Sequence, residues 1–355
     1  MPRLTTLVTE LATALGMTGV GSVDVGLARP PSEIVGVSAE QWNALSIARG
    51  AGEMQADFET AFVNGRAFLD AADGLRGRGA RVIEWKGEHK DPVPAPLPVD
   101  LRVDHVYLVS CKYGSKVLGN HSPHALIDGL LEGSLTRQHA AEAGDWFRLV
   151  APEAYADLWA MMREFATVEG LPADPAEMDV AQRKAASKMF PRSELPPPLA
   201  AAYTEMSAIV SRHSAARLND RLGPLKGRQR ERFLWRLLRI GTAPYFILGS
   251  SGKSAAAHSN RPVRLRIGTP WDVHQVSTFR GLRVVPVEAG QPRLNLVADY
   301  TMSDGASRQL ALHVEIRWSH GKFGGAPEAK VYLDSPPAHV PGYFPLEPPD
   351  GQFAF

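Results

Sequence analysis

The most constraining feature of the sequence is the strand-like segment DLRVDHVYLVSCKY at 100–113. As one continuous strand, at about 3.3 Å per residue, it would hold Asp100 roughly 40 Å from Lys112. Asp104 and His105 at its centre are instead suited to a two-residue turn, a place that accepts Asp well and His less well than Gly. We therefore expect a β-hairpin, which brings the two ends of the segment together.

The predicted hairpin gathers polar side chains at its open end. It places Asp100 opposite Val109 and within about 5–8 Å of Ser110. Alternation along the second strand puts Ser110 and Lys112 on one face and Cys111 on the other. A carboxylate can hold a hard divalent cation, which polarises a phosphoryl group and activates water, and a nearby lysine can stabilise the attacking hydroxide. The pattern thus indicates a site for metal-assisted phosphoryl chemistry.

This arrangement resembles the PD-(D/E)XK, or restriction-endonuclease-like, nuclease superfamily. In that family a helix with an acidic residue precedes a hairpin that carries Asp on one strand and (Asp/Glu)-X-Lys on the next. The matching residues over roughly 40–135 are Pro98-Val99-Asp100, Ser110-Cys111-Lys112 and the helical acid Glu59. The resemblance implies a mixed-sheet nuclease domain, with Mg²⁺ as its ion and Mn²⁺ as the alternative.

One position departs from the family pattern. Ser110 stands where the family has Asp or Glu, and a hydroxyl is a weak metal ligand beside a carboxylate. Either Glu84, on the preceding strand, or Glu59 supplies the missing charge, or the site is inactive. The candidate catalytic residues are accordingly Asp100, Lys112, Ser110, Glu84 and Glu59, with Asp100 and Glu84 as metal ligands.

A basic stretch points to a nucleic-acid partner. From Arg212 to Arg239 there are eight Arg and one Lys against Asp220 and Glu231, a local net charge of +7, although the whole chain has a net charge of only +1. Arg228, Arg232, Arg236 and Arg239 recur at intervals of three or four residues, which predicts one flank of a helix. A basic helix with one solvated face can neutralise a phosphate backbone. The alternatives are a solvated helix face or a helix that binds an acidic protein. The residues expected to contact double-stranded DNA, or RNA as the alternative, are Lys116, Arg228, Arg232, Arg236 and Arg239.

The expected fold class is α/β (α+β), in three consecutive segments. These are a restriction-endonuclease-like domain at 1–135, a helical segment at 136–240 and a β-rich substrate-recognition domain at 241–355. A single cysteine excludes an internal disulfide framework and fits a reducing cytoplasm. We expect no membrane span and no secretory signal, because no sufficiently long apolar run occurs.

Two other motifs compete with the hairpin. Glu315 and Glu328-Ala329-Lys330, with His320 nearby, also form an acid followed by E-X-K, but Gly and Pro residues precede the triplet where the family has an apolar strand. The loop at 249–254 resembles a phosphate-binding loop but lacks the first Gly of the Walker pattern. We expect a plain anion contact or a flexible loop there rather than nucleotide hydrolysis.

The sequence therefore predicts a metal-dependent endonuclease that hydrolyses DNA phosphodiesters in restriction or phage defence. A homodimer or a subunit of a defence complex is the expected assembly. The alternative is a nucleic-acid-binding or complex-forming subunit that kept the fold and lost catalysis. A third hypothesis is a different enzyme whose site lies near Glu315, His320 and Lys330.

Overall fold

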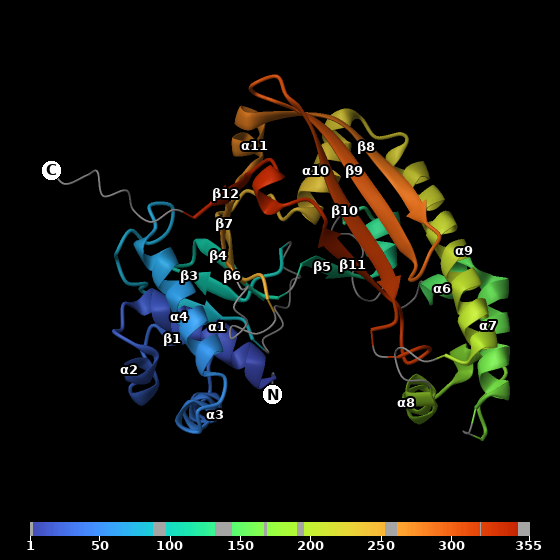
Figure 1. Ribbon diagram of the computed structural model, residues 1–355, viewed down its shortest axis with the longest axis horizontal. Coiled ribbons are helices and arrows are strands. Elements are labelled where there is room, and N and C mark those ends of the chain that lie inside the picture. The colour runs from blue at the N-terminus through green and yellow to red at the C-terminus, as the bar shows by residue number, and fades with distance from the viewer. Residues whose placement is uncertain are drawn as a thin grey trace. The chain divides into compact units, whose positions relative to one another are not determined.

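The computed structural model describes residues 3–87, 97–114, 116–131, 144–166, 169–189, 195–252, 261–319 and 321–346. The protein is a mixed α/β protein, and its chain divides into two compact units (Figure 1). Unit 1 comprises Met1–Lys116, Arg239–Val276 and Pro337–Phe355, and unit 2 comprises Val117–Leu238 and Ser277–Pro336. Each unit is therefore assembled from separate stretches of the chain.

Unit 1 is built on a seven-stranded mixed sheet. Its strands, in spatial order, are β1 (Ile34–Val35), β2 (Ile83–Trp85), β3 (Leu101–Val103), β4 (Tyr107–Tyr113), β6 (Tyr245–Ser250), β7 (Pro262–Ile267) and β12 (Tyr343–Pro345). β2, β3 and β4 form an antiparallel meander, whereas β4 and β6 run parallel. All six residues of β6 are buried, as is typical of a parallel strand covered on both faces.

Helices from the N-terminal part of the chain complete unit 1. They are α1 (Leu4–Thr18), α2 (Val23–Ala28), α3 (Ala39–Gly50) and α4 (Gln55–Asp70), and α11 (Pro270–Val276) comes later in the chain. α1 and α4 cross closely because Gly16 and Gly65 face each other's backbones; a Cβ on Gly65 would lie 2.0 Å from the carbonyl oxygen of Thr13. Phe58, Phe62 and Leu69, at helical spacing on α4, are buried in the core.

The hairpin expected between β3 and β4 is present, but its register is shifted. Asp104 and His105 both have positive φ angles, of 49° and 61°, and the amide of Val106 donates to the carbonyl of Val103 at 3.0 Å. Beyond this turn Val103 pairs with Tyr107, so the two strands are offset by one residue from the predicted pairing. The position of the turn at Asp104 and His105 was thus predicted correctly, and the register was not.

Unit 2 is built on a five-stranded antiparallel sheet. Its strands, in spatial order, are β5 (Val117–His121), β11 (Glu328–Leu333), β10 (Ser307–Arg317), β9 (Arg293–Met302) and β8 (Ser277–Val287). Its α-helices are α6 (Trp146–Val150), α7 (Pro152–Glu164), α8 (Val180–Met189), α9 (Pro197–Leu222) and α10 (Gly227–Leu237). α9 and α10 pack against the sheet, and β9 buries every second residue, which fits a sheet covered on one face.

The two units do not follow the three consecutive segments expected from the sequence. β6, β7 and β12, from the predicted C-terminal domain, pair into the sheet of unit 1. β5, from the predicted N-terminal domain, pairs with β11 in unit 2. The partners of these strands depend on pairing between residues far apart in the sequence, which local patterns do not reveal. In the part of the chain that the structure describes, no helix has the length and apolar character needed to cross a membrane.

Candidate functional site

The carboxylate of Asp100 is fixed against the start of the Ser110-Cys111-Lys112 triplet. Its Oδ2 accepts hydrogen bonds from Ser110 Oγ at 2.9 Å and from the Cys111 amide at 2.6 Å. Because of the shift in register, Leu101 rather than Asp100 lies opposite Val109, so Asp100 falls level with Ser110. Ser110 is fully buried. The predicted meeting of Asp100 and Ser110 is therefore present, and the serine acts as a hydrogen-bond donor to the acid.

Lys112 belongs to a cluster of charged side chains that also contains Asp100, Glu10 and Arg239. Burial lowers its pKa, and the positive charge of Arg239 lowers it further. The negative charges of Asp100 and Glu10 act in the opposite direction, which places both carboxylates within electrostatic reach of the ammonium group. A lysine held among charges of both signs is suited to stabilising a developing negative charge.

Glu10 is an acid within electrostatic reach of Asp100 that was not predicted from the sequence. It projects from α1, and its Oε2 accepts a hydrogen bond from Trp85 Nε1 at 2.6 Å. Burial and the nearby charge of Asp100 raise the pKa of Glu10 to about 7, although the Trp85 hydrogen bond and the charge of Lys112 oppose this rise. A signal was present in the sequence, because Glu10 is the one acidic residue in the largely apolar 1–23 stretch.

Arg239 also belongs to this cluster, and its predicted position on a basic helix was wrong. α10 ends at Leu237, and Arg239 follows with a φ of 63°, so the helical spacing does not continue to it. Its guanidinium is buried and donates to Tyr245 Oη at 2.6 Å. The Tyr245 hydroxyl in turn donates to the carbonyl of Pro98 at 2.6 Å. Arg239 thus belongs to unit 1, within electrostatic reach of Lys112.

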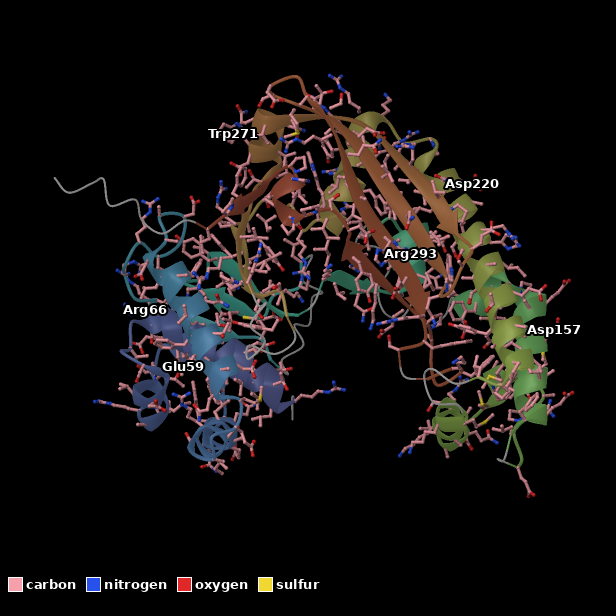
Figure 2. All side chains as sticks on the ribbon, in the orientation of Figure 1. Glu59, Arg66, Asp157, Asp220, Trp271 and Arg293 are labelled. Carbon is pink, nitrogen blue, oxygen red and sulfur yellow. The ribbon has the colours of Figure 1, made fainter. Side chains whose placement is uncertain are left out.

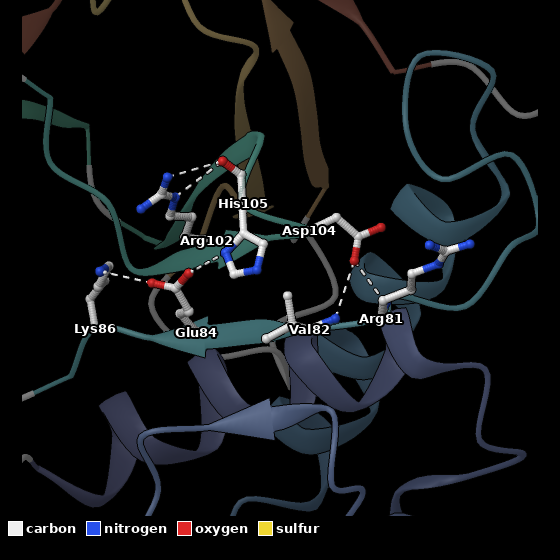
Figure 3. A network of polar contacts seen from close by, with 7 residues as sticks. All are labelled: Arg81, Val82, Glu84, Lys86, Arg102, Asp104 and His105. Atoms are coloured by element: carbon white, nitrogen blue, oxygen red, sulfur yellow. Dashed lines mark hydrogen bonds and ion pairs between the residues drawn. The ribbon is translucent and has the colours of Figure 1, made fainter.

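Glu84 belongs to a separate network around the hairpin (Figure 3). Its Oε1 contacts His105 Nδ1 at 2.9 Å, and its Oε2 contacts Lys86 Nζ at 3.2 Å. Partial burial acts to raise the pKa of Glu84, but the hydrogen bonds from His105 and Lys86 outweigh it, and the pKa is lowered. Both carboxylate oxygens of Glu84 are therefore engaged by His105 and Lys86.

Glu59 lies on α4, apart from both of these networks (Figure 2). Its exposed side chain accepts a hydrogen bond from Arg49 at 2.6 Å, and Arg49 also binds Asp24. The helical acid within electrostatic reach of Asp100 is Glu10 on α1. Sequence order alone could not distinguish these helices, because both precede the hairpin.

The donor set suits a magnesium ion rather than a transition metal. Mg²⁺ is held in proteins by one or two carboxylates, with water or substrate oxygens completing its coordination. Asp100 and Glu10 are two such carboxylates within electrostatic reach of each other, and a cation bound near both would relieve their repulsion. Among the residues that the structure describes, no group of three or more acidic, His or Cys side chains is arranged for a metal. Asp100 and Glu10 are therefore the residues that fit an ion in this cluster.

The remaining predicted phosphate contacts differ in accessibility. Arg228 and Arg232, on α10, and Lys116, after β4, are exposed. Arg236 is half-buried and donates to the carbonyl of Leu130 at 3.0 Å, so it supports the fold of unit 2. Of the expected basic face of α10, Arg228 and Arg232 are the arginines presented to solvent.

The competing motifs have structural explanations. Glu315 lies opposite Lys330 in the β10–β11 register, but its ion pair is with Arg317, and Lys330 pairs with Glu328. This cluster is a salt-linked polar face of the sheet. His320, and the Lys253-Ser254 end of the loop at 249–254, lie outside the described residues.

Cys111 is not arranged as a nucleophile. The residue packs against the core of unit 1. Burial raises the pKa of its thiol well above the ordinary value, and the charges of Asp100 and Glu10 raise it further. A reactive cysteine needs the opposite, electropositive environment.

Comparison of the chain with protein-family models, with curated proteins and with solved structures found no match.

Proposed function

We propose that the protein is a metal-dependent nuclease that hydrolyses DNA phosphodiesters, in a restriction or phage-defence setting. The observation that carries the proposal is the Asp100 carboxylate, which is hydrogen-bonded to Ser110 and Cys111 directly before Lys112 on β4. Glu10 is held by Trp85, which lies opposite Leu101, and both Asp100 and Lys112 are within its electrostatic reach. The order of the elements also agrees with the restriction-endonuclease-like pattern. An acid-bearing helix (α1) precedes an antiparallel meander, Asp100 directly precedes β3, and Lys112 lies near the end of β4.

The chemistry follows from the charges of the site. Asp100 and Glu10 would hold Mg²⁺, which supplies Lewis acidity at a phosphoryl oxygen and a lowered pKa for a bound water. Ser110 and the Cys111 amide hold the Asp100 carboxylate in one orientation. Lys112 places a compact positive charge where negative charge grows on the attacked phosphate. Arg228 and Arg232 would add contacts to the phosphate backbone, with double-stranded DNA as the substrate.

The test is cleavage of plasmid DNA by the purified protein with Mg²⁺. Asp100→Ala, Glu10→Gln and Lys112→Ala should each lower the cleavage rate by about 100-fold or more, because each removes a charge that acts on the transition state. Glu59→Ala should cut like the wild type, since its carboxylate pairs with Arg49. If Asp100→Ala and Lys112→Ala cut as fast as the wild type, the proposal is wrong.

One observation favours a second function, that of a nucleic-acid-binding protein without catalysis. Ser110 replaces the acid of the family motif, and it donates a hydrogen bond to the same Asp100 oxygen that the Cys111 amide binds. Such a protein would bind duplex DNA with an affinity that falls steeply with salt. It would cut no DNA or RNA with Mg²⁺ or Mn²⁺ at any pH.

A further inference from the structure

Arg239 occupies a position that its neighbours in the sequence do not explain. It is 2% exposed and has a left-handed φ of 63°, a conformation that costs free energy in a non-glycine residue. Burying a guanidinium also carries a desolvation penalty. It stands where the chain re-enters unit 1 after the long excursion through unit 2. The structure therefore retains a strained and buried arginine at this point.

The guanidinium of Arg239 begins a short relay of hydrogen bonds. Arg239 Nη1 donates to Tyr245 Oη, and Tyr245 Oη donates to the Pro98 carbonyl, both at 2.6 Å. Tyr245 is fully buried on β6, and its ring lies 5.6 Å from the Arg239 guanidinium carbon. A charged donor polarises the hydroxyl and so strengthens its bond to the next acceptor.

The relay ends two residues before Asp100. Pro98 and Asp100 belong to the segment that leads into β3, and the Asp100 amide donates to Val109 at 2.9 Å. Burial raises the pKa of Tyr245 to about 12, so its hydroxyl keeps its proton and remains a donor at neutral pH. The approach to Asp100 is thereby held from the β6 side, while Ser110 and Cys111 hold its carboxylate from the β4 side.

We propose that Arg239 is a positioning residue of the site, which acts through Tyr245 to fix the Pro98–Asp100 segment and so aim the Asp100 carboxylate. A catalytic role for this orientation of Asp100 rests on the proposed nuclease function. The positioning itself is a property of the folded chain, and it can be tested without metal or DNA.

The first experiment measures amide hydrogen exchange by NMR in the metal-free, full-length protein. The informative amide is that of Cys111, because it donates to the Asp100 side chain rather than to a neighbouring strand. Tyr245→Phe and Arg239→Gln should speed its exchange by about tenfold, the effect of losing roughly one hydrogen bond. The Val109 and Phe246 amides, in the same sheet, should keep their wild-type rates.

Matched controls exist for both variants. Tyr300 is a buried tyrosine whose hydroxyl has no hydrogen-bond partner among the described residues, and Arg183 is an arginine of unit 2 that donates to the carbonyls of Met178 and Ala176. Tyr300→Phe and Arg183→Gln should leave Cys111 exchange unchanged. Tyr245→Phe removes a single oxygen, which also hydrogen-bonds Ser110. Wild-type Cys111 exchange in this variant alone overturns the relay, even where Arg239→Gln does not fold.

The second experiment measures Mn²⁺ binding by calorimetry and separates positioning from simple charge. Removing a cation beside a metal site should by Coulomb's law tighten metal binding. Positioning predicts the opposite: Arg239→Gln should bind Mn²⁺ about tenfold more weakly, and so should the uncharged change Tyr245→Phe.

Three results are decisive. Wild-type Cys111 exchange in both variants, or tighter Mn²⁺ binding by Arg239→Gln, overturns the role of Arg239. Faster Cys111 exchange in a protein that cuts no DNA supports the positioning role while removing the nuclease proposal.

Discussion

Glu10 makes the stability of the protein depend on pH in an unusual direction. Its pKa is raised from 4.5 to about 7 by burial and by Asp100, so the folded state binds more protons than the unfolded state between these values. The contribution of Glu10 to the free energy of unfolding is therefore complete below pH 4.5. It is lost as the pH rises through 7, and the loss is at most about 3 kcal/mol.

Glu10→Gln should remove this dependence, because an amide stays neutral. In EDTA, we expect the variant to have a higher melting temperature than the wild type at pH 8 and a similar one at pH 5. Thermal unfolding of both proteins from pH 5 to 8 checks this. Parallel curves for the two proteins would show that Glu10 does not titrate in this range.

Individual residues of the site were unequally predictable. The contact between Asp100 and Ser110 followed from one turn, because a hairpin fixes which side chains meet. Glu10 could not be placed, since the helix that carries it precedes the hairpin by about 90 residues and nothing local shows where it packs. Arg239 was assigned to a helix by its spacing, but the helix ends at Leu237. Residue spacing predicts which side chains share a helix face only for residues that lie within the helix.

The β3–β4 hairpin depends on its turn. Asp104 Oδ1 accepts from the Arg81 and Val82 amides at 2.7 and 3.2 Å (Figure 3). Its Oδ2 accepts from Arg78 at 2.6 Å. Asp104→Ala removes these contacts and leaves a non-glycine residue at positive φ, so it should lower the free energy of unfolding by about 2–3 kcal/mol. Urea denaturation measures this change.

Asp157→Ala, on the exposed side of α7, is the comparison and should change the stability by less than about 0.5 kcal/mol (Figure 2). If Asp104→Ala were as stable as Asp157→Ala, the turn would not control the hairpin.

The exposed arginines of α10 give a second prediction at this scale. Arg228→Gln with Arg232→Gln should leave the melting temperature unchanged and should lower the salt slope of DNA binding by about 2, one unit for each phosphate contact. Fluorescence anisotropy at several salt concentrations measures the slope. Arg236→Gln should instead lower the stability, because it loses the bond to Leu130. An unchanged slope in the double variant would remove α10 from the DNA contact.

At the scale of the molecule, the interleaved units predict which fragments fold. The fragment 1–135 matches the domain expected from the sequence, but it lacks β6, β7 and β12 of the unit 1 sheet. We expect it to show no cooperative thermal transition by circular dichroism, in contrast to the full-length chain. A sharp transition in the fragment would mean that β4 does not need its parallel partner.

The sequence revealed the mixed α/β class and most of the strands, because alternation and turn residues are local signals. It did not reveal the two units, because β4 and β6 pair across about 130 residues of intervening chain. YFILG at 245–249 is an apolar run with no alternation. Such a run is the sequence signal of a strand buried on both faces, and the structure shows β6 buried in this way.

The same interval matters during synthesis of the protein on the ribosome. β4 emerges with its free edge exposed and must wait for β6, which at 5–20 residues per second takes roughly 7–25 s. The unpaired edge of β4, next to apolar residues, can pair with strands of other nascent chains. We therefore expect the yield of folded protein to depend on translation speed and on chaperones that shield this edge, more than a two-domain chain of the same length with consecutive domains would.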